Sequence, residues 1–328
     1  MDTKLVITPS PHIHSGLSMT KMMWSVVYAL IPAWLVGVYY FGLGAITVTA
    51  VAVASVVFFE WAITKYFLKK EPTLNDGSAL ITGILLAMNL PSNLPIYMVI
   101  IGGLVAIGIG KMSFGGLGQN LFNPALVGRV FLLISFPAAM TTWPVPKAMS
   151  FVPDGTTGAT VLGILKEGVK NGEKVPDLMS QMPGMWELIL GNMGGSFGEI
   201  SGIAIILGGL FLLYKKTISW HIPVAMIGTV VVFTGILHGF NPDKYAGPLF
   251  HIFSGGLLLG TVFMATDLVA SPMTRKGQLV YGVGIGVITV VIRLWGAYPE
   301  GVSFAILLMN GWSPLINRYM KPRRYGEK

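Results

Sequence analysis

The chain has 328 residues, of which 53% are hydrophobic and only 11% are charged, and its mean hydropathy is +0.69. Soluble domains carry about a quarter charged residues, so this composition excludes an ordinary soluble protein and predicts a polytopic membrane protein. The chain contains no cysteine, which excludes disulfides, thiolate zinc sites and iron–sulfur clusters ligated by its own residues. The net charge of +8 does not indicate nucleic-acid binding, because the basic residues flank apolar stretches.

The N-terminal segment, residues 1–21, is polar and has no small-residue cleavage site after an apolar core, so no signal peptide is expected. His12 and His14 lie two residues apart in this segment. They have the chemistry to share a metal ion, but a solvated pair near the membrane surface is favoured.

Ten apolar stretches predict ten membrane helices, five before and five after a long polar segment. The first half, 22–137, contains stretches at 22–41, 45–64, 78–90, 94–110 and 121–137. The second half, 200–317, contains stretches at 200–214, 220–238, 249–266, 278–295 and 302–317. We therefore divide the chain into a short N-terminal segment (1–21), two five-helix halves, a loop between them (138–199) and a basic tail (318–328).

The distribution of basic residues predicts the orientation. Cytoplasmic loops of membrane proteins are enriched in Lys and Arg. With a cytoplasmic N-terminus, ten crossings return the C-terminus to the cytoplasm and leave the 138–199 loop outside. The basic residues that then fall on the cytoplasmic side include Lys65, Lys69, Lys70, Lys111, Lys215, Lys216, Arg275, Lys276, Arg318, Lys321, Arg323, Arg324 and Lys328.

Two of the apolar stretches are interrupted in a similar way. Residues 78–90 would form about 20 Å of helix, against a hydrocarbon core of about 30 Å, and prolines follow directly. Residues 77–89 can be laid over 255–267, which aligns Asn89 with Asp267. Because each half has an odd number of crossings, the two halves are predicted to be inverted repeats. Such repeats place a binding or passage site between the halves, although close packing of glycine-rich helices also explains many of these glycines.

Several charges lie in or near the apolar stretches: Glu60, Asp76, Arg129, Asp267 and Arg293. A charge at mid-membrane costs at least about 2.5–3.5 kcal/mol, so it usually faces a cavity or a partner. We take Asp267, Asp76 and Glu60 as candidates for an ion path. Asp267 has the best setting, since a broken helix exposes carbonyl oxygens beside its carboxylate. Glu60 is equally consistent with snorkelling to the cytoplasmic surface. The partners of the two arginines stay open.

Two glycine-rich strings flank apolar stretches. Residues 114–124 would let backbone N–H groups approach a ligand, but a plain turn explains them equally well. The string lacks the ending of a phosphate-binding loop and does not follow a soluble strand as a dinucleotide motif would. Residues 194–201, which include Glu199, are consistent with a helix cap.

The heptad at residues 154–160 reads Asp-Gly-Thr-Thr-Gly-Ala-Thr and lies in the long polar loop. Its composition is that of an ordinary turn. A hydroxyl-rich, glycine-loosened strip outside the membrane also suggests chemistry, with Thr160 as the residue that would carry it.

Together, five strings resemble one family in content and order. They lie at 10–14, 75–80, 116–124, 198–199 and 263–267. On these strings the chain resembles the RnfD subunits of Rnf ion-translocating ferredoxin:NAD oxidoreductase complexes over essentially its whole length. It is similar, at greater distance, to the NqrB subunits of sodium-pumping NADH:quinone oxidoreductases.

The resemblance implies a covalent cofactor. In that family a flavin transferase esterifies the last threonine of an Asp-x-x-Ser/Thr-Gly-Ala-Thr motif to the phosphate of FMN. The matching residues here are Asp154, Thr157, Gly158, Ala159 and Thr160, so Thr160 is expected to carry the FMN. The family also implies a non-covalent flavin, expected to be riboflavin, inside the membrane part.

The resemblance further implies a membrane subunit that passes electrons between redox partners while contributing to Na⁺ or H⁺ translocation in a prokaryotic inner membrane. The expected partners are a second subunit with covalent flavin, iron–sulfur subunits, small membrane subunits and the flavin transferase. Asp76 and Asp267 resemble membrane acids of the family. From the residues alone, a stand-alone solute transporter or channel fits inverted repeats equally well, and a structural membrane anchor is a third possibility.

Overall fold

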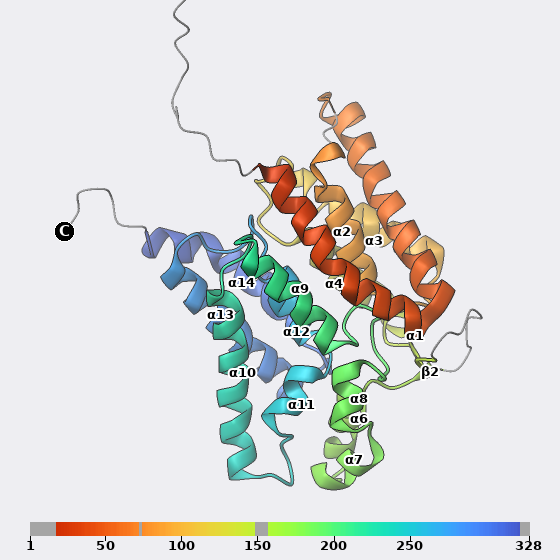
Figure 1. Cartoon of the computed structure of the whole chain (residues 1–328), viewed down its shortest axis with the longest axis vertical. Helices are drawn as coiled ribbons and strands as arrows, with labels where there is room; N and C mark the ends of the chain where they lie inside the picture. Colours follow the sequence, from red (N-terminus) through yellow and green to blue (C-terminus); the bar gives the residue numbers. More distant parts are fainter. Residues whose placement is uncertain (1–17, 72–73, 148–156, 322–328) are drawn as a thin grey trace, which may run out of the picture.

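The computed structural model describes residues 18–71, 74–147 and 157–321. His12, His14 and Asp154 lie outside these ranges. Within them the only strands are β1 (Trp143–Pro144) and β2 (Thr157–Gly158), which pair antiparallel, and most of the remainder is helical (Figure 1). The predicted all-α class is confirmed.

The first helix, α1 (Met19–Ala62), consists of two arms joined at Gly42. Gly42 has φ 56° and ψ −136°, a conformation that costs glycine little because it has no side chain. Figure 1 shows one arm running down from the start of α1 and the other returning upward. The kink falls between the predicted stretches 22–41 and 45–64, and the second arm ends in a π-helical turn, η1 (Ile63–Phe67).

The other helices of the first half are short. They are η2 (Leu74–Asp76), α2 (Ser78–Met88), α3 (Ile96–Gly108), η3 (Met112–Phe114) and α4 (Pro124–Ser135). The α4 helix begins at Asn123, whose side chain accepts hydrogen bonds from the N–H groups of Ala125 and Leu126. Pro124 occupies the first helical position, where it sacrifices no hydrogen bond.

The segment predicted as a loop includes a small helical layer, whose helices α6, α7 and α8 are seen at the bottom of Figure 1. It contains α5 (Pro137–Met140), the two strands, α6 (Val161–Lys170), α7 (Val175–Gln181) and α8 (Met185–Leu190). Val161, Leu165, Leu178, Leu188 and Phe250 contribute to a second apolar core beneath it. The polar composition hid this layer, because only one face of each short helix is apolar.

The second half contains α9 (Gly202–Tyr214), α10 (His221–Phe240), α11 (Pro248–Phe253), α12 (Leu257–Leu259), η4 (Gly260–Met264), α13 (Arg275–Trp295) and α14 (Val302–Tyr319). The predicted stretch 249–266 is thus broken into three pieces. The chain turns at Ser254 and Gly255, where Gly255 has φ 63°.

Four helical segments in the described ranges are long and apolar enough to cross a membrane: Met19–Phe67, Ile96–Phe114, His221–Phe240 and Arg275–Trp295. Large apolar side chains cover the outside of the bundle, for example Phe240, which is 84% exposed. In water this exposure would be costly, whereas lipid tails solvate it. The chain is therefore a membrane protein.

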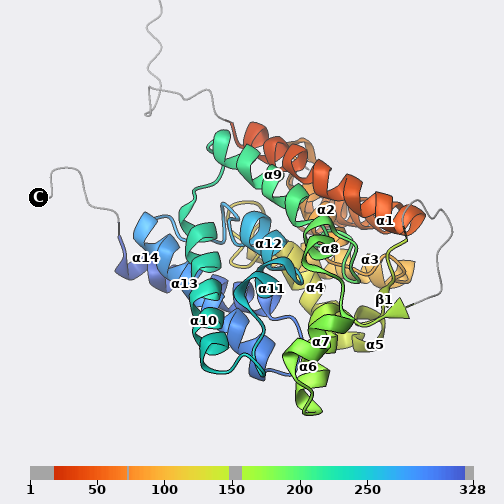
Figure 2. The ribbon, with the colours of Figure 1, turned by 60° about the horizontal axis from the view of Figure 1, so that its bottom comes forward.

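The halves meet through two helix pairs. The α9 helix lies along α1 (Figure 2), and α14 packs against α4. The start of α1 and the end of α14 both lie in the upper part of Figure 1, opposite α6, α7 and α8.

Candidate functional site

Thr160 lies at the first turn of α6 and opens onto a cavity. Its Oγ1 accepts a hydrogen bond of 3.1 Å from the Gly163 N–H, so Thr160 is the N-cap of this helix. The residues lining this Thr160 cavity include Arg129, Trp143, Thr160, Glu199, Tyr298 and Glu300. Thr160, which the sequence analysis places in the outer loop, therefore shares a cavity with Arg129 of α4.

The neighbouring motif residues are accessible. Thr157, Gly158 and Ala159 are exposed, whereas Thr160 is half-buried. Thr157 and Gly158 form β2, which pairs with Trp143 and Pro144 and holds the motif extended.

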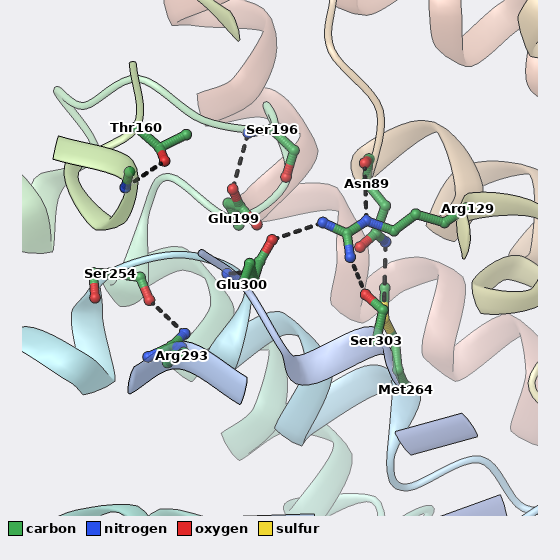
Figure 3. A network of polar contacts seen from close by, with 12 residues as sticks. Asn89, Arg129, Thr160, Ser196, Glu199, Ser254, Met264, Arg293, Glu300 and Ser303 are labelled. Atoms are coloured by element: carbon green, nitrogen blue, oxygen red, sulfur yellow. Dashed lines mark hydrogen bonds and ion pairs between the residues drawn. The ribbon is translucent and has the colours of Figure 1, made fainter. Parts of the chain in front are cut away.

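Arg129, buried in α4, joins three parts of the protein at the Thr160 cavity (Figure 3). Its Nη2 lies 2.7 Å from Glu300 Oε2, in the connection between α13 and α14. It also donates to the Ser303 hydroxyl in α14 and, over 3.3 Å, to the carbonyl of Asn89 at the end of α2. The partner of Arg129, which the sequence left open, is therefore Glu300, an acid of the second half.

A second carboxylate, Glu199, lies beside Glu300. Its Oε1 accepts a hydrogen bond of 3.0 Å from the Ser196 N–H, while Oε2 has no partner among the described residues. A side chain on Gly256 would meet Glu300 Oε1 at 2.7 Å and Glu199 Oε2 at 2.8 Å, so the two carboxylates converge over this glycine.

These two acids lie in the connections before α9 and α14 and differ in protonation. Burial raises the pKa of Glu199, and the neighbouring Glu300 raises it further. Burial alone would also raise the pKa of Glu300, but Arg129 and Arg293 together lower it below its usual value. Glu300 is therefore the ionised member of the pair and Glu199 the one that retains a proton.

Arg293 is buried near the end of α13 and has a different kind of partner. Its guanidinium donates to the carbonyls of His251 (2.6 Å) and Ser254 (3.0 Å). These carbonyls are left free where α11 ends, so Arg293 compensates for the helix break.

A second cavity lies around Asp267, beyond η4. Its lining includes Ser78, Lys111, Asn120, Asn123, Thr266 and Asp267. The glycine-rich string 114–124 thus contributes to a cavity wall. Asp267 is half-buried, and its Oδ1 accepts a hydrogen bond of 3.1 Å from the Val269 N–H.

The other two ion-path candidates join this Asp267 cavity through Lys111. The Lys111 ammonium donates to both oxygens of Glu60 at 2.7 Å and to the Ser78 hydroxyl at 2.7 Å. The Ser78 hydroxyl in turn donates to Asp76 Oδ1 at 2.8 Å. Glu60 is only 5% exposed, so the snorkelling interpretation is wrong. Lys111 is itself buried and neutralises Glu60, while its place on the cytoplasmic side of the membrane stays a prediction.

Hydrogen bonds connect the walls of the two cavities at the paired helix breaks. The Asn89 side chain donates to the Met264 sulfur over 3.8 Å, and the Asn123 side chain donates to the Met264 carbonyl over 3.3 Å. Asn89 also provides the carbonyl bound by Arg129. Thr160 itself lines only the first cavity, so the structure separates it from Asp76, Asp267 and Glu60.

Sequence reasoning missed three residues. They are Lys111, the buried partner of Glu60, Glu300, the partner of Arg129, and His251, whose carbonyl accepts from Arg293. A buried acid such as Glu60 signals that a cation is needed, but the cation lies 51 residues away. Glu300 lies between Pro299 and Gly301 outside any apolar stretch, so its pairing with Arg129 had no sequence signal.

The fold and these buried charges define a polytopic helical membrane protein with polar cavities between its two halves. Residues 6–326 match the model of the NQR2, RnfD, RnfE family, and the chain belongs to this family.

Three relatives illustrate the similarity, and each is a subunit of a redox complex. One, from the proton-translocating ferredoxin:NAD(+) oxidoreductase complex of Clostridium ljungdahlii, is 46% identical over 327 residues, covering 98% of this chain and 96% of that protein. Another, from the Na(+)-translocating ferredoxin:NAD(+) oxidoreductase complex of Acetobacterium woodii, is 45% identical, with 99% and 96% covered. A third, from the ion-translocating oxidoreductase complex of Stutzerimonas stutzeri, is 42% identical, with 94% and 92% covered.

Proposed function

We propose that this chain is the membrane subunit of an ion-translocating ferredoxin:NAD⁺ oxidoreductase complex, with FMN esterified to Thr160. In this role it passes electrons between redox subunits and contributes to Na⁺ or H⁺ translocation. The observation that carries the proposal is the position of the Thr160 hydroxyl, at the end of the flavinylation motif and at the mouth of a cavity lined by buried charges.

The residues around Thr160 fit an esterified flavin. A phosphate on Oγ1 would lie at the N-terminus of α6, where free N–H groups and the helix dipole favour negative charge. Trp143 and Tyr298 provide aromatic walls for the ring system. The partnerless Glu199 Oε2 offers a polar group at the same cavity. A bound flavin would supply the electron-transfer chemistry, while these residues orient it and limit access of water.

The exposed strip Thr157, Gly158 and Ala159 supports access by a flavin transferase. An enzyme that esterifies Thr160 must first bind the motif as an extended peptide. Pairing between β1 and β2 already holds part of the strip extended, so little ordering entropy would be lost on binding.

We place the non-covalent flavin, expected to be riboflavin, in the Asp267 cavity. Asn120 and Asn123 present amides there, and Ser78 and Thr266 present hydroxyls. Such groups suit the carbonyl oxygens and ring nitrogens of an isoalloxazine.

The ion path is assigned to the same cavity. Lys111 already neutralises Glu60 and contacts Ser78, the residue bound to Asp76. Asp267 has no bound cation among the described side chains, so it is the carboxylate most suited to take up a translocated ion. The names of the two relatives cited first specify protons and Na⁺, respectively, and a carboxylate beside free carbonyls suits both.

The arrangement of neighbours supports two inverted five-helix halves, 22–137 and 200–317. The α1 helix contacts α3 as α10 contacts α13, and α3 contacts α4 as α13 contacts α14. The halves meet through corresponding members, α1 with α9 and α4 with α14. The loop 138–199 would then lie outside an inner membrane, with the terminal segments 1–21 and 318–328 in the cytoplasm.

The partners follow from the redox role. A cysteine-free chain cannot ligate iron–sulfur clusters, so electrons must enter from and leave to other subunits. We expect iron–sulfur subunits, a second subunit with covalent flavin and small membrane subunits.

A denaturing gel tests the proposal. The complex is purified from cells that contain the transferase, and the band of this subunit is inspected for flavin fluorescence, followed by mass measurement of the peptide around Thr160. A fluorescent band with FMN on that peptide is expected. A dark band would contradict the proposal and favour a stand-alone transporter.

Asp267→Asn is expected to lower ion translocation in proteoliposomes much more than it lowers flavin content, because it removes the carboxylate but leaves Thr160 untouched. Asp177→Asn, which neutralises an exposed acid in α7, is the matched control and should change neither. Unchanged translocation in Asp267→Asn would make Asp267 a structural residue.

A further inference from the structure

A third cavity, distinct from the two already described, lies between α6, the connection from α10 to α11, and the end of α13. Its polar lining comprises Lys166, Lys244, Tyr245, His251 and Arg293. None of the described residues that line this Lys166 pocket is acidic. Two lysines and an arginine therefore give the pocket a positive lining, and Glu300, which lies outside the lining, offsets part of the charge of Arg293.

Two buried groups in the Lys166 pocket have unused hydrogen-bonding capacity. His251 is 2% exposed, and neither ring nitrogen has a partner among the described residues. Arg293 uses two guanidinium nitrogens on backbone carbonyls, but its Nε is also without a partner in the described part of the chain. Buried polar atoms are rarely left unpaired, so both groups point to a ligand with several acceptor oxygens.

Lys166 is held at the same place by the backbone. Its ammonium donates to the carbonyls of Tyr298 (2.7 Å) and Ile292 (3.2 Å), which leaves one N–H for a ligand. Burial lowers the pKa of Lys166, and an anion beside it would favour its charged form. Lys244 is exposed and lies at the rim.

The rest of the wall is apolar. Leu162, Leu165 and Leu294 line it, together with Trp295, which is 56% exposed. Tryptophan is enriched where membrane helices leave the lipid, and Trp295 is the last residue of α13. A ligand that fills the pocket therefore needs an anionic head and an apolar body.

We propose that the Lys166 pocket binds the phosphate group of an anionic phospholipid, with its glycerol and acyl region against Leu165, Leu294 and Trp295. The predicted orientation places this pocket on the outer side of the membrane, where Trp295 marks the level of the lipid headgroups. Charge-assisted hydrogen bonds to a lipid phosphate give these cations a role at that surface. The site adjoins the Thr160 cavity, with which it shares Leu162 and Pro299, and has no lining residue in common with the Asp267 cavity.

Native mass spectrometry of the purified, delipidated complex tests the proposal. Phosphatidylglycerol, phosphatidylcholine and inorganic phosphate are added separately, and bound adducts are counted. Phosphatidylglycerol is expected to bind at least about tenfold more tightly than phosphatidylcholine, because the choline ammonium would bring a like charge to the lysines and arginine of the pocket. Lys166→Gln should weaken phosphatidylglycerol binding by about tenfold.

Lys170→Gln is the matched control, since Lys170 lies one turn further along α6 and is exposed; it should bind like the wild type. If Lys166→Gln does not assemble, Lys244→Gln gives the same comparison with a smaller loss. Equal binding by variant and wild type, or equal binding of both lipids, would overturn the site. Inorganic phosphate bound as tightly as phosphatidylglycerol would overturn the lipid assignment.

Discussion

Thr160→Ala is expected to yield a subunit with no flavin that survives denaturation, because a phosphoester requires the Oγ1 atom. The same change removes the N-cap of α6, which costs about 1 kcal/mol. Fluorescence of the subunit band on a denaturing gel measures the first effect. Flavin loss should be complete, while the helix should be only modestly less stable.

Two control variants separate these effects. Thr160→Asn keeps a side-chain oxygen that can cap α6 but has no hydroxyl, so it should also lose the flavin. Thr142→Ala removes an exposed hydroxyl close to β1 that does not line the Thr160 cavity, and it should retain full fluorescence. A fluorescent Thr160→Ala band would show that the flavin is attached elsewhere.

Lys111→Met is expected to produce the largest loss of stability. It leaves the Glu60 carboxylate buried without its cation, and breaking a buried ion pair from one side costs about 3–5 kcal/mol. The side chains of Lys111 and Glu60 are 2% and 6% exposed, so water cannot compensate. The midpoint of thermal unfolding of the purified complex, followed through this subunit, should fall clearly.

The double variant Glu60→Gln/Lys111→Met removes both charges and should recover most of the lost stability. Lys70→Met removes an exposed lysine and serves as the control, with little expected change. If Lys111→Met unfolded at the wild-type midpoint, the ion pair would contribute nothing to folding.

The sequence predicted where the helices lie better than how they meet. Lipid contact requires continuous apolar surface, so each predicted stretch contains a helix, and the prolines after Asn89 end α2 where expected. The number of crossings and the inversion of the halves stay predictions. The helices α6, α7 and α8 were not anticipated, because short amphipathic helices in a polar segment resemble a loop.

The candidate sites show the same difference: the sequence predicted local motifs but not the contacts between distant segments. The heptad motif identified Thr160 locally, whereas the cavity that Thr160 shares with Arg129 and Glu300 depends on contacts between distant segments. Arg129 and Glu300 are 171 residues apart, and no periodicity links them. A charge within an apolar stretch indicates that a partner is needed, but the hydropathy pattern does not identify the partner residue.

The contacts of Arg129 have a mechanical consequence. One guanidinium holds the end of α2, the Glu300 connection and α14 together, so separating the halves as rigid bodies would expose a buried charge to an apolar surrounding. We therefore expect ion access to change through movement of the broken segment 254–267, with α4 and α14 remaining in place. Since the chain has no cysteine of its own, pairs of introduced cysteines can carry spin labels. The distance across α4 and α14 should then be the same in oxidised and reduced complexes, and a change there would favour rocking halves.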